Sequence, residues 1–311
     1  MTQTLVTRTI AELRAALKDH RRAGRTIGLV PTMGYLHRGH MALATEARRA
    51  CDVVVLSIFV NPTQFGPNED LATYPRDLEG DLDLCRRHDV DIVFAPDVEE
   101  MYPEPMQTAV EVTSLSTILI GAQRPGHFKG VATVVAKLFN IVQPDCAYFG
   151  EKDFQQLVTI RRMVRDLSMD IAVVGVPTVR EVDGLAASSR NVRLTAEDRR
   201  AAVVISRALD RAGAMAQAGE SDPSAIVEAV RAMIAAEPRA ELRSVDLRDA
   251  ATLAEIAAIG DASAVVLVTV RFGNVLLIDQ REIGTAGRAS ARQGAATEGN
   301  GHERTKRDQA A

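Results

Sequence analysis

The amino-acid sequence predicts an α/β fold, a doubly wound, Rossmann-like parallel sheet followed by a smaller C-terminal α+β domain. Short runs rich in valine and isoleucine alternate with amphipathic stretches over about 180 residues, the order that builds a parallel sheet covered by helices. The alternation then gives way to two helical stretches and a group of strands. We therefore predict a first domain at residues 1–178, a second at 179–283 and a disordered tail at 284–311.

The first domain should contain buried strands separated by amphipathic helices. The apolar runs expected to form strands are residues 25–30, 52–60, 89–96, 146–149 and 170–177. The stretches expected to form helices are residues 11–22, 77–88, 130–143 and 154–167, and a further helix should open within 31–50. Helical spacing in 130–143 predicts one apolar face, made of Val131, Val134, Val135, Leu138 and Val142.

The second domain should pair two helices with a small set of strands. Thr195 with Asp198 is typical of a capping box and predicts a helix running to about residue 218. Asp222 before Pro223 predicts a second helix, to about residue 236. Strands are expected at 241–249, 262–272 and, after a hairpin turn at residues 273–274, at 275–279. From residue 284 the chain is rich in glycine, alanine and charge without apolar periodicity, the pattern of a disordered tail.

Composition narrows the kind of partner and the compartment. The 311 residues (33.6 kDa) carry a net charge of −4, which leaves no general basic surface for nucleic acid or an anionic membrane. We therefore expect a small-molecule partner. Three widely spaced cysteines indicate a reducing compartment. Because no apolar run reaches the ~18 residues of a membrane span and the N-terminus has no secretory apolar region, we expect a cytoplasmic protein.

The stretch PTMGYLHRGH, residues 31–40, lies where the first long strand should pass into a helix. Free backbone N–H groups at such a helix N-terminus favour an anion. Gly34 and Gly39 allow close backbone approach, and His37 and His40, three residues apart, can point the same way, so the motif suits a phosphate. The same pattern also fits capping or packing histidines, or a metal-binding pair. The nucleotide fingerprints GxGxxG and GxxxxGKS/T are absent.

Polar segments follow three further strands of the predicted sheet. They are NPTQF at 61–65, FGEKDFQQ at 149–156 and SSRN at 188–191. Taken alone, their charges fit solvated surface side chains and their glutamines fit surface amides. Because the carboxyl ends of parallel strands meet at one edge of a sheet, we expect these segments to gather around one cleft.

Five segments together resemble the pantoate–β-alanine ligase (pantothenate synthetase) family, over roughly residues 3–283. They are PTMGYLHRGH, VNPTQFGPNEDLATYPRD, RPGHFKGVATVVAKLFNIVQPD, FGEKDFQQL and VGVPTVREVDGLAASSRN, in this order and spacing. The HxGH motif by itself indicates only the wider nucleotidylyl-transferase superfamily. The resemblance implies a cytoplasmic homodimer that joins ATP and pantoate into pantoyl adenylate, with loss of pyrophosphate. The amine of β-alanine then displaces AMP to give pantothenate.

The resemblance also implies which residues form the site. The ATP phosphates would be held by Met33, Gly34, Tyr35, Leu36, His37, Arg38, Gly39 and His40, with His40 as proton donor. Further ATP contacts would come from Gly150, Glu151, Lys152 and Asp153, from Val179 at the adenine, and from Ala187, Ser188, Ser189 and Arg190 at the phosphates. Pantoate would be bound by Gln64 and Gln156, in a pocket also lined by Asn61, Arg124 and His127.

The chemistry of the implied reaction agrees with these assignments. A substrate carboxylate is ionised at pH 7, so its attack on phosphorus needs positioning and neutralisation of charge rather than a general base. We expect the positive charge from His37, His40, Lys152, Arg190 and Mg²⁺, with Asp81 as the candidate metal ligand. Neutral glutamines suit pantoate because a carboxylate there would repel it. Asp81 also fits a simply solvated helix face.

Four positions depart from the family's common pattern, and two other functions stay open. Thr63 replaces a frequent Met, Ile120 a frequent Glu and Ala187 a Met or Leu, while Gly80 stands where some relatives have an acidic residue. None of these removes a phosphate contact. The alternatives are another nucleotidylyltransferase of the HxGH superfamily, which would turn over without β-alanine, and a non-catalytic nucleotide sensor, which would usually lack the four cations.

Overall fold

The computed structural model describes residues 4–67, 69, 71–260 and 263–284. Its larger sheet has six strands, β1 (Leu5–Thr7), β2 (Ile27–Thr32), β3 (Val53–Ile58), β4 (Ile92–Phe94), β5 (Cys146–Gly150) and β6 (Ala172–Val176). The strands run in the order β1-β4-β3-β2-β5-β6, and every pair is parallel. The doubly wound parallel sheet is therefore confirmed. The predicted tail, apart from Gly284, lies outside the described residues.

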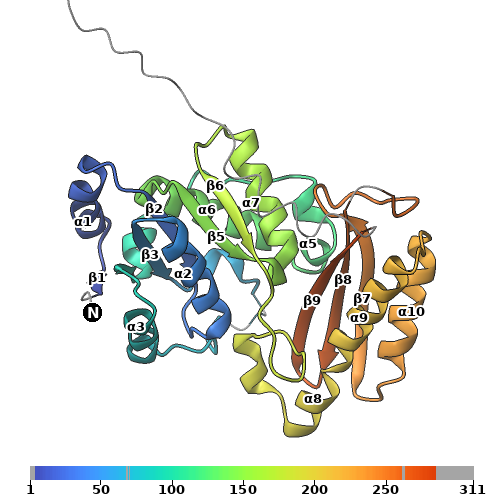
Figure 1. The fold of residues 1–311 in the computed structure, drawn as a ribbon. Helices are drawn as coiled ribbons and strands as arrows, with labels where there is room; N and C mark the ends of the chain where they lie inside the picture. The colour runs from blue at the N-terminus through green and yellow to red at the C-terminus, as the bar shows by residue number, and fades with distance from the viewer. Residues whose placement is uncertain (1–3, 68, 70, 261–262, 285–311) are drawn as a thin grey trace, which may run out of the picture.

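The helices of this part cover both faces of the sheet (Figure 1). They are α1 (Ile10–Arg22), α2 (Arg38–Ala50), α3 (Leu78–Arg87), α4 (Val98–Met101), α5 (Ile120–Gln123), α6 (His127–Val142) and α7 (Phe154–Asp166). Strand residues alternate between the faces: Leu29 packs with α1, α6 and α7, whereas the adjacent Val30 packs with α2 and α3. Because both faces are covered, the strands read as continuous apolar runs.

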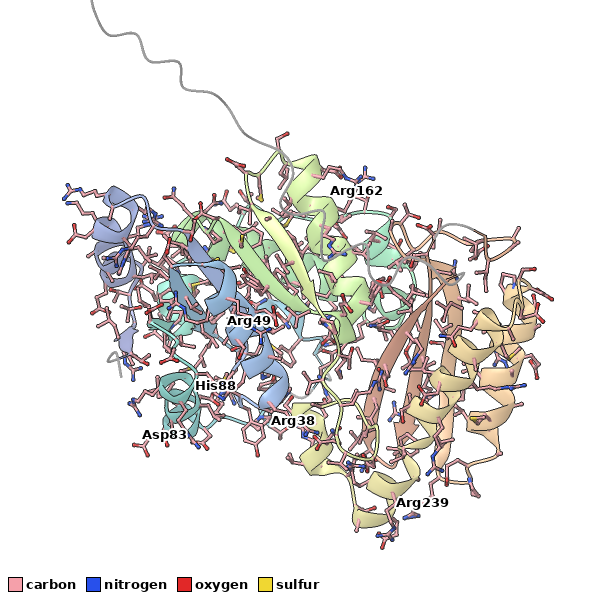
Figure 2. The ribbon with its side chains drawn as sticks, viewed as in Figure 1. Arg38, Arg49, Asp83, His88, Arg162 and Arg239 are labelled. Carbon is pink, nitrogen blue, oxygen red and sulfur yellow. The ribbon has the colours of Figure 1, made fainter. Side chains whose placement is uncertain are left out.

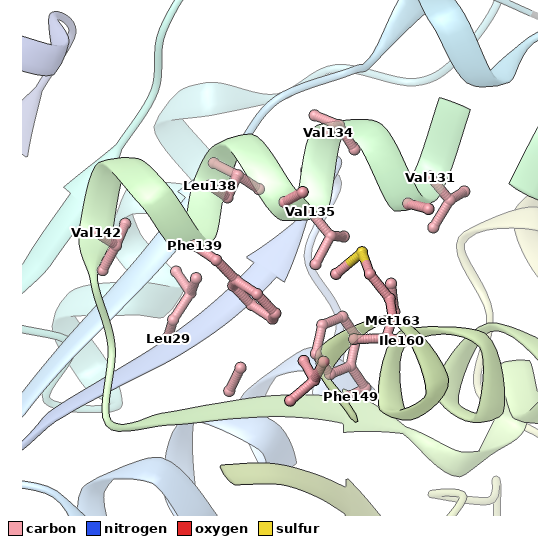
Figure 3. Close-up of a cluster of buried hydrophobic side chains, with 14 of the residues drawn as sticks. Leu29, Val131, Val134, Val135, Leu138, Phe139, Val142, Phe149, Ile160 and Met163 are labelled. Carbon is pink, nitrogen blue, oxygen red and sulfur yellow. The ribbon is translucent and has the colours of Figure 1, made fainter. Parts of the chain in front are cut away.

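The apolar face predicted for the 130–143 stretch is confirmed. All five of its predicted residues are buried, and Figure 3 shows α6 lying over Leu29 of β2, Phe149 of β5 and two residues of α7. The rings of Phe139 and Phe149 meet edge to face with centroids 6.5 Å apart. This packing fixes α6 across the sheet and sets its N-terminal end beside the loop that follows β3.

Sequence patterns missed strand β1 and helices α4 and α5. Strand β1 has three residues and one exposed apolar side chain, Leu5, so it carries no periodic signal. Helices α4 and α5 have four residues each, too few to show a helical repeat. These elements are stabilised by pairing and packing rather than by their own composition.

The C-terminal part is an antiparallel sheet of β7 (Ala240–Asp249), β8 (Ala264–Phe272) and β9 (Val275–Ile283), ordered β7-β8-β9. The predicted hairpin turn is present, with Gly273 at a φ of 54°. Helices α9 (Val204–Gln217) and α10 (Pro223–Ala235) pack on one face through a separate apolar core, and Asp222 caps α10 as predicted. The division into a separate domain at residues 179–283 stays a prediction. Val265, on the other face of β8, belongs to the apolar core of the larger sheet.

The single helix predicted from Thr195 to about residue 218 is wrong. Thr195 does cap a helix, accepting from the backbone N–H of Asp198, but this helix is the short α8 (Ala196–Ala201). The chain then turns before α9 begins, and the Ser206 hydroxyl donates to the Val203 carbonyl at 3.0 Å. The break itself lies at Ala202 and Val203, and neither residue is a glycine or proline that would signal a helix end.

Candidate active site

A cavity of about 230 Å³ opens at the carboxyl ends of β2, β3, β5 and β6. Strands β2 and β5 are adjacent in the sheet but distant in the chain, so this is the topological switch point, where ligands bind in open α/β folds. Most of the residues implied by the resemblance line the cavity: Met33, His37, Gly39, His40, Asn61, Gln64, Arg124, His127, Gly150, Lys152, Asp153, Gln156, Val179, Ala187, Ser188, Ser189 and Arg190. Those that do not line it are Gly34, Tyr35, Leu36, Arg38, Glu151 and Asp81.

His37 and His40 form the start of α2 and line the cavity at the same time. His37 is the N-cap residue, and its Nδ1 accepts from the backbone N–H of Gly39 at 3.1 Å. The backbone N–H of His37 in turn donates to Nδ1 of His40 at 3.2 Å. Because both Nδ1 atoms accept, the neutral rings carry their proton on Nε2. The capping alternative and the phosphate interpretation are therefore compatible.

The expectation that both histidines are cations is not supported. Burial, with the positive charge of Lys152 next, lowers the pKa of His37 to about 4. Burial also lowers the pKa of His40 to about 3, with smaller contributions from His37 and Lys152. Both rings are neutral N–H donors at pH 7 in the substrate-free protein. Positive charge at the cavity comes instead from Lys152, Arg190 and the N-terminal end of α2.

Asp81, the predicted metal ligand, lies beneath the 33–37 loop instead of in the cavity. Its Oδ2 accepts from the backbone N–H of Tyr35 at 2.8 Å and its Oδ1 from that of Leu36 at 2.6 Å. The residue is only 3% exposed. The described part of the chain has no group of three or more His, Cys, Asp or Glu arranged to hold a metal ion. The residues present therefore do not fit a metal held at Asp81.

A buried amide pair forms the wall of the cavity beside the N-terminal end of α6. Asn61 is 1% exposed, and its Nδ2 donates to Oε1 of Gln64 at 3.1 Å and to the Gly130 carbonyl at 3.2 Å. Its Oδ1 accepts from the Tyr102 hydroxyl at 2.8 Å. With both ends bonded inside the protein, Asn61 orients Gln64 rather than offering polar atoms of its own. Asn61 lines the cavity, and its place in the pantoate pocket stays a prediction.

Glycine at 130 is required by this packing. A Cβ at Gly130 would lie 2.4 Å from the Thr63 carbonyl oxygen and 2.7 Å from the Cα of Gln64. Helix α6 therefore touches the backbone of the 3₁₀ turn Pro62–Gln64 directly. The close approach holds Gln64 at the cavity.

Arg124 is held by a carboxylate that sequence reasoning did not single out. Its Nε donates to Oε1 of Glu69 at 2.7 Å, and its Nη2 also bonds that carboxylate. His127 lies beside it, with Nε2 3.1 Å from Arg124 Nη1 and Nδ1 2.9 Å from the Gln64 carbonyl oxygen. Burial and the Arg124 charge lower the pKa of His127 to about 4, so this ring too is neutral. Glu69 carries no local signal, since it is one acidic residue in a polar loop.

A family model described as Pantoate-beta-alanine ligase matches residues 5–282. The chain belongs to this family. It is 60% identical over 275 residues to the pantothenate synthetase of Sinorhizobium medicae, covering 88% of this chain and 94% of that protein. It is 56% identical over 277 residues to the pantothenate synthetase of Agrobacterium fabrum, covering 89% and 95%. The resemblance read from the motifs is confirmed.

Solved structures of the pantoate-beta-alanine ligase family have the same fold. The pantothenate synthetase of Thermus thermophilus matches with a TM-score of 0.85 and 49% identity, over 90% of this chain and all of that one. A Francisella tularensis ligase, complexed with beta-gamma ATP and beta-alanine, matches with a TM-score of 0.73 and 32% identity, over 89% and 97%. Those two ligands are bound to the Francisella protein.

The family's last motif, residues 174–191, completes β6 and then forms a hairpin beside the cavity. The backbone N–H of Ala187 donates to the Val179 carbonyl at 2.9 Å, which pairs the two arms. Arg180 lies between these two residues in the chain. Its guanidinium donates two hydrogen bonds, of 2.7 and 3.0 Å, to the carboxylate of Asp279 in β9. Arg38, predicted at the phosphates, instead pairs with Glu181 of this hairpin. Ion pairs thus tie the hairpin to both α2 and the C-terminal sheet.

The departures from the family pattern are accommodated locally. The Thr63 hydroxyl donates to Oδ1 of Asn61 at 2.9 Å, adding to the amide pair. Ala187 lines the cavity and leaves it room. Ile120 lines a neighbouring hollow of about 300 Å³, which shares Arg124, Lys152 and other residues with the main cavity and continues to β9. Sequence reasoning missed several further lining residues, which adjoin the motifs or lie on the apolar face of α6: Thr32, Leu43, Phe59, Phe65, Tyr74, Val131, Val134, Val135, Leu138, Phe149 and Thr178.

Proposed function

We propose that this protein joins pantoate to β-alanine at the expense of ATP, through a pantoyl-adenylate intermediate, and releases pyrophosphate and AMP. Membership of the family supports the overall reaction. The observation that carries the site assignment is that four separate segments converge on one cavity at the switch point. These are the 33–40 loop, the Gln64 turn, the 150–156 segment and the 187–190 segment.

The first step transfers the adenylyl group to pantoate. A carboxylate oxygen of pantoate attacks the α-phosphorus of ATP, a new P–O bond forms, and the bond to pyrophosphate breaks. No proton has to be removed, because the carboxylate is ionised. Lys152 and Arg190 offset the negative charge that gathers on the phosphates, and the Nε2–H groups of His37 and His40 donate to phosphate oxygens.

The second step uses the amine of β-alanine. The neutral amine attacks the acyl carbon of the adenylate, the C–O bond to AMP breaks, and the amine nitrogen loses a proton. AMP therefore leaves with one oxygen that was in the pantoate carboxylate. Gln64 and Gln156 are assigned to pantoate, and Arg124 and His127 contact the Gln64 carbonyl oxygen.

The proposal also includes a magnesium ion, a cellular compartment and an oligomeric state. Mg²⁺ would enter with the ATP phosphates, since magnesium is commonly held by substrate phosphates and few protein ligands. No helix in the described ranges is long and apolar enough to cross a membrane. On the family resemblance we assign the protein to the cytoplasm as a homodimer. Light scattering tests the dimer, which should have twice the 33.6 kDa mass of the chain.

The decisive experiment incubates the protein with ATP, pantoate carrying ¹⁸O in its carboxylate, and β-alanine. We expect pantothenate, pyrophosphate and AMP that carries one ¹⁸O. Without β-alanine, pyrophosphate should appear in a burst equal to the enzyme concentration and then stop. Unlabelled AMP, or ADP, would rule out the acyl-adenylate route. Continuous turnover without β-alanine would indicate another nucleotidylyltransferase, and ATP binding without turnover a nucleotide sensor.

A further inference from the structure

The Asp81 carboxylate is bonded through both oxygens to the backbone of the loop that leads into α2. It comes from the first turn of α3, on the far side of β3 in the chain, and reaches the N–H groups of Tyr35 and Leu36. Hydrogen bonds to an ionised acceptor are about twice as strong as neutral ones. Two of them on adjacent residues fix the orientation of both peptide planes.

The loop needs this support because its backbone is unusual. Gly34 has a φ of 80° and Tyr35 a φ of 51°, so two consecutive residues adopt the left-handed conformation. Such a conformation is unfavourable for a tyrosine and persists only where the surroundings hold it. A Cβ at Gly34 would lie 3.0 Å from Oδ2 of Asp81 and 2.9 Å from the Ile58 side chain, so the loop fits tightly over the carboxylate.

The loop in turn sets the position of both histidines. Leu36 immediately precedes His37, whose extended backbone forms the N-cap of α2 and whose N–H bonds to His40. A shift of the Tyr35–Leu36 peptides would move this N–H and the His37 ring with it. Misplacement of a positioned donor by about 1 Å can cost a hundredfold in rate.

We propose that Asp81 is a positioning residue of the nucleotide site, which holds the 33–37 loop and through it His37 and His40, and is not a magnesium ligand. A magnesium ligand must present a carboxylate oxygen to the ion, and Asp81 is not among the residues that line the cavity. Both oxygens of Asp81 are directed at backbone N–H groups, and the side chain is enclosed by the loop. This inference rests on the proposed function only in taking the cavity as the ATP site.

The test compares Asp81→Asn with Asp83→Asn. The first substitution would keep the shape of the side chain but set an NH₂ group against one of two backbone donors. Asp83 lies on the outer side of the same helix and pairs with Arg86 and Arg87 (Figure 2), so its variant is the matched control. We expect Asp81→Asn to weaken ATP binding by calorimetry and to lower kcat by roughly tenfold to a hundredfold, and Asp83→Asn to change neither.

A magnesium titration separates the two roles of Asp81. For a positioning residue, the Mg²⁺ concentration that gives half-maximal activity stays unchanged in Asp81→Asn, and excess Mg²⁺ restores nothing. A tenfold rise in that concentration, or rescue by excess Mg²⁺, would show that Asp81 is a ligand and overturn the proposal. A variant with a lower urea midpoint but wild-type ATP affinity and kcat would also overturn it, since Asp81 would then be merely structural.

A second variant covers the case in which Asp81→Asn does not fold. Gly34→Ala leaves the carboxylate in place but pushes the loop away from it, and should reproduce the weaker ATP binding at unchanged magnesium dependence. Unaltered ATP affinity in Gly34→Ala would contradict the proposal. The activity of the wild-type protein tests the proposed function separately. If wild type makes no AMP and pantothenate, the proposed function is wrong, whereas the variants test only the role of Asp81.

Discussion

The backbone N–H of His37 donates to Nδ1 of His40 at 3.2 Å, and the two rings lie 4.1 Å apart, tilted by 37°. His37 itself accepts, through Nδ1, from the backbone N–H of Gly39 two residues later. Each imidazole thus has one nitrogen engaged in the protein and the other, protonated nitrogen available to the cavity. The two rings therefore present two Nε2–H donors, and the start of α2 determines this tautomer.

Because Nδ1 and Nε2 of His40 have separate roles, asparagine and glutamine at position 40 should have opposite effects. In His40→Asn the side-chain oxygen can replace Nδ1 and keep the cap, but nothing replaces Nε2–H, so turnover should fall ~10²-fold at nearly wild-type stability. In His40→Gln an amide N–H can reach the place of Nε2, while the cap is lost at a cost of about 1 kcal/mol. Steady-state kinetics and urea unfolding measure both. Equal loss of turnover in the two variants would contradict the assignment.

Lys152 should matter through its charge at the cavity. Lys152→Ala should lower kcat by ~10²-fold or more with little change in the free energy of unfolding, the size expected for one preorganised charge. Lys129→Ala, which removes an exposed lysine two residues into α6, is the control and should be near wild type. A Lys152 variant with wild-type turnover, or one that aggregates, would place this residue in a structural role.

The low histidine pKa values predict an acid-sensitive fold. Because an unfolded histidine titrates near 6.5 and these rings titrate at about 4 and 3, the unfolded chain binds more protons between pH 6.5 and 4. Stability must therefore fall as pH decreases through that range. The full shift is worth about 2 kcal/mol per ring at pH 5, and solvent in the open cavity should reduce it to roughly 1 kcal/mol.

Urea unfolding at pH 7 and pH 5 tests this dependence. The double variant His37→Asn/His40→Asn should lose less stability between the two pH values than wild type does. Carboxylates and His127 contribute equally to both proteins and cancel in the comparison. An identical loss in the two proteins would mean that the rings titrate normally.

The Arg180–Asp279 pair should couple the hairpin that contains Val179 and Ala187 to the C-terminal sheet. Asp279 is 3% exposed and accepts two bonds from the guanidinium, so Asp279→Asn should destabilise the protein by about 3 kcal/mol. We also expect a severalfold higher KM for ATP, because Val179 and Ala187 flank this anchor. Glu241→Gln, at an exposed ion pair of β7, should change stability by under about 1 kcal/mol. Unchanged KM for ATP in Asp279→Asn would show that the pair serves stability alone.

Local sequence patterns were sufficient for most of the fold. Strands buried on both faces read as apolar runs, and α6 shows its buried stripe at helical spacing, because these signals repeat within a few residues. Strand β1, helices α4 and α5 and the break between α8 and α9 were missed or wrong. The break lies at Ala202 and Val203, and neither residue is a glycine or proline that would signal a helix end.

By itself the sequence determined the fold class, the family and the segments that meet at the cavity, since each is written in contiguous motifs placed at strand ends. Only the tertiary structure decided what individual side chains do there. Burial lowers the pKa of His40 and keeps its ring neutral. Asp81 is enclosed and bonds to the loop. Glu69 pairs with Arg124, which lies 55 positions away in the chain. Protonation and pairing depend on desolvation and on distances between remote segments, and neither quantity exists until the chain has folded.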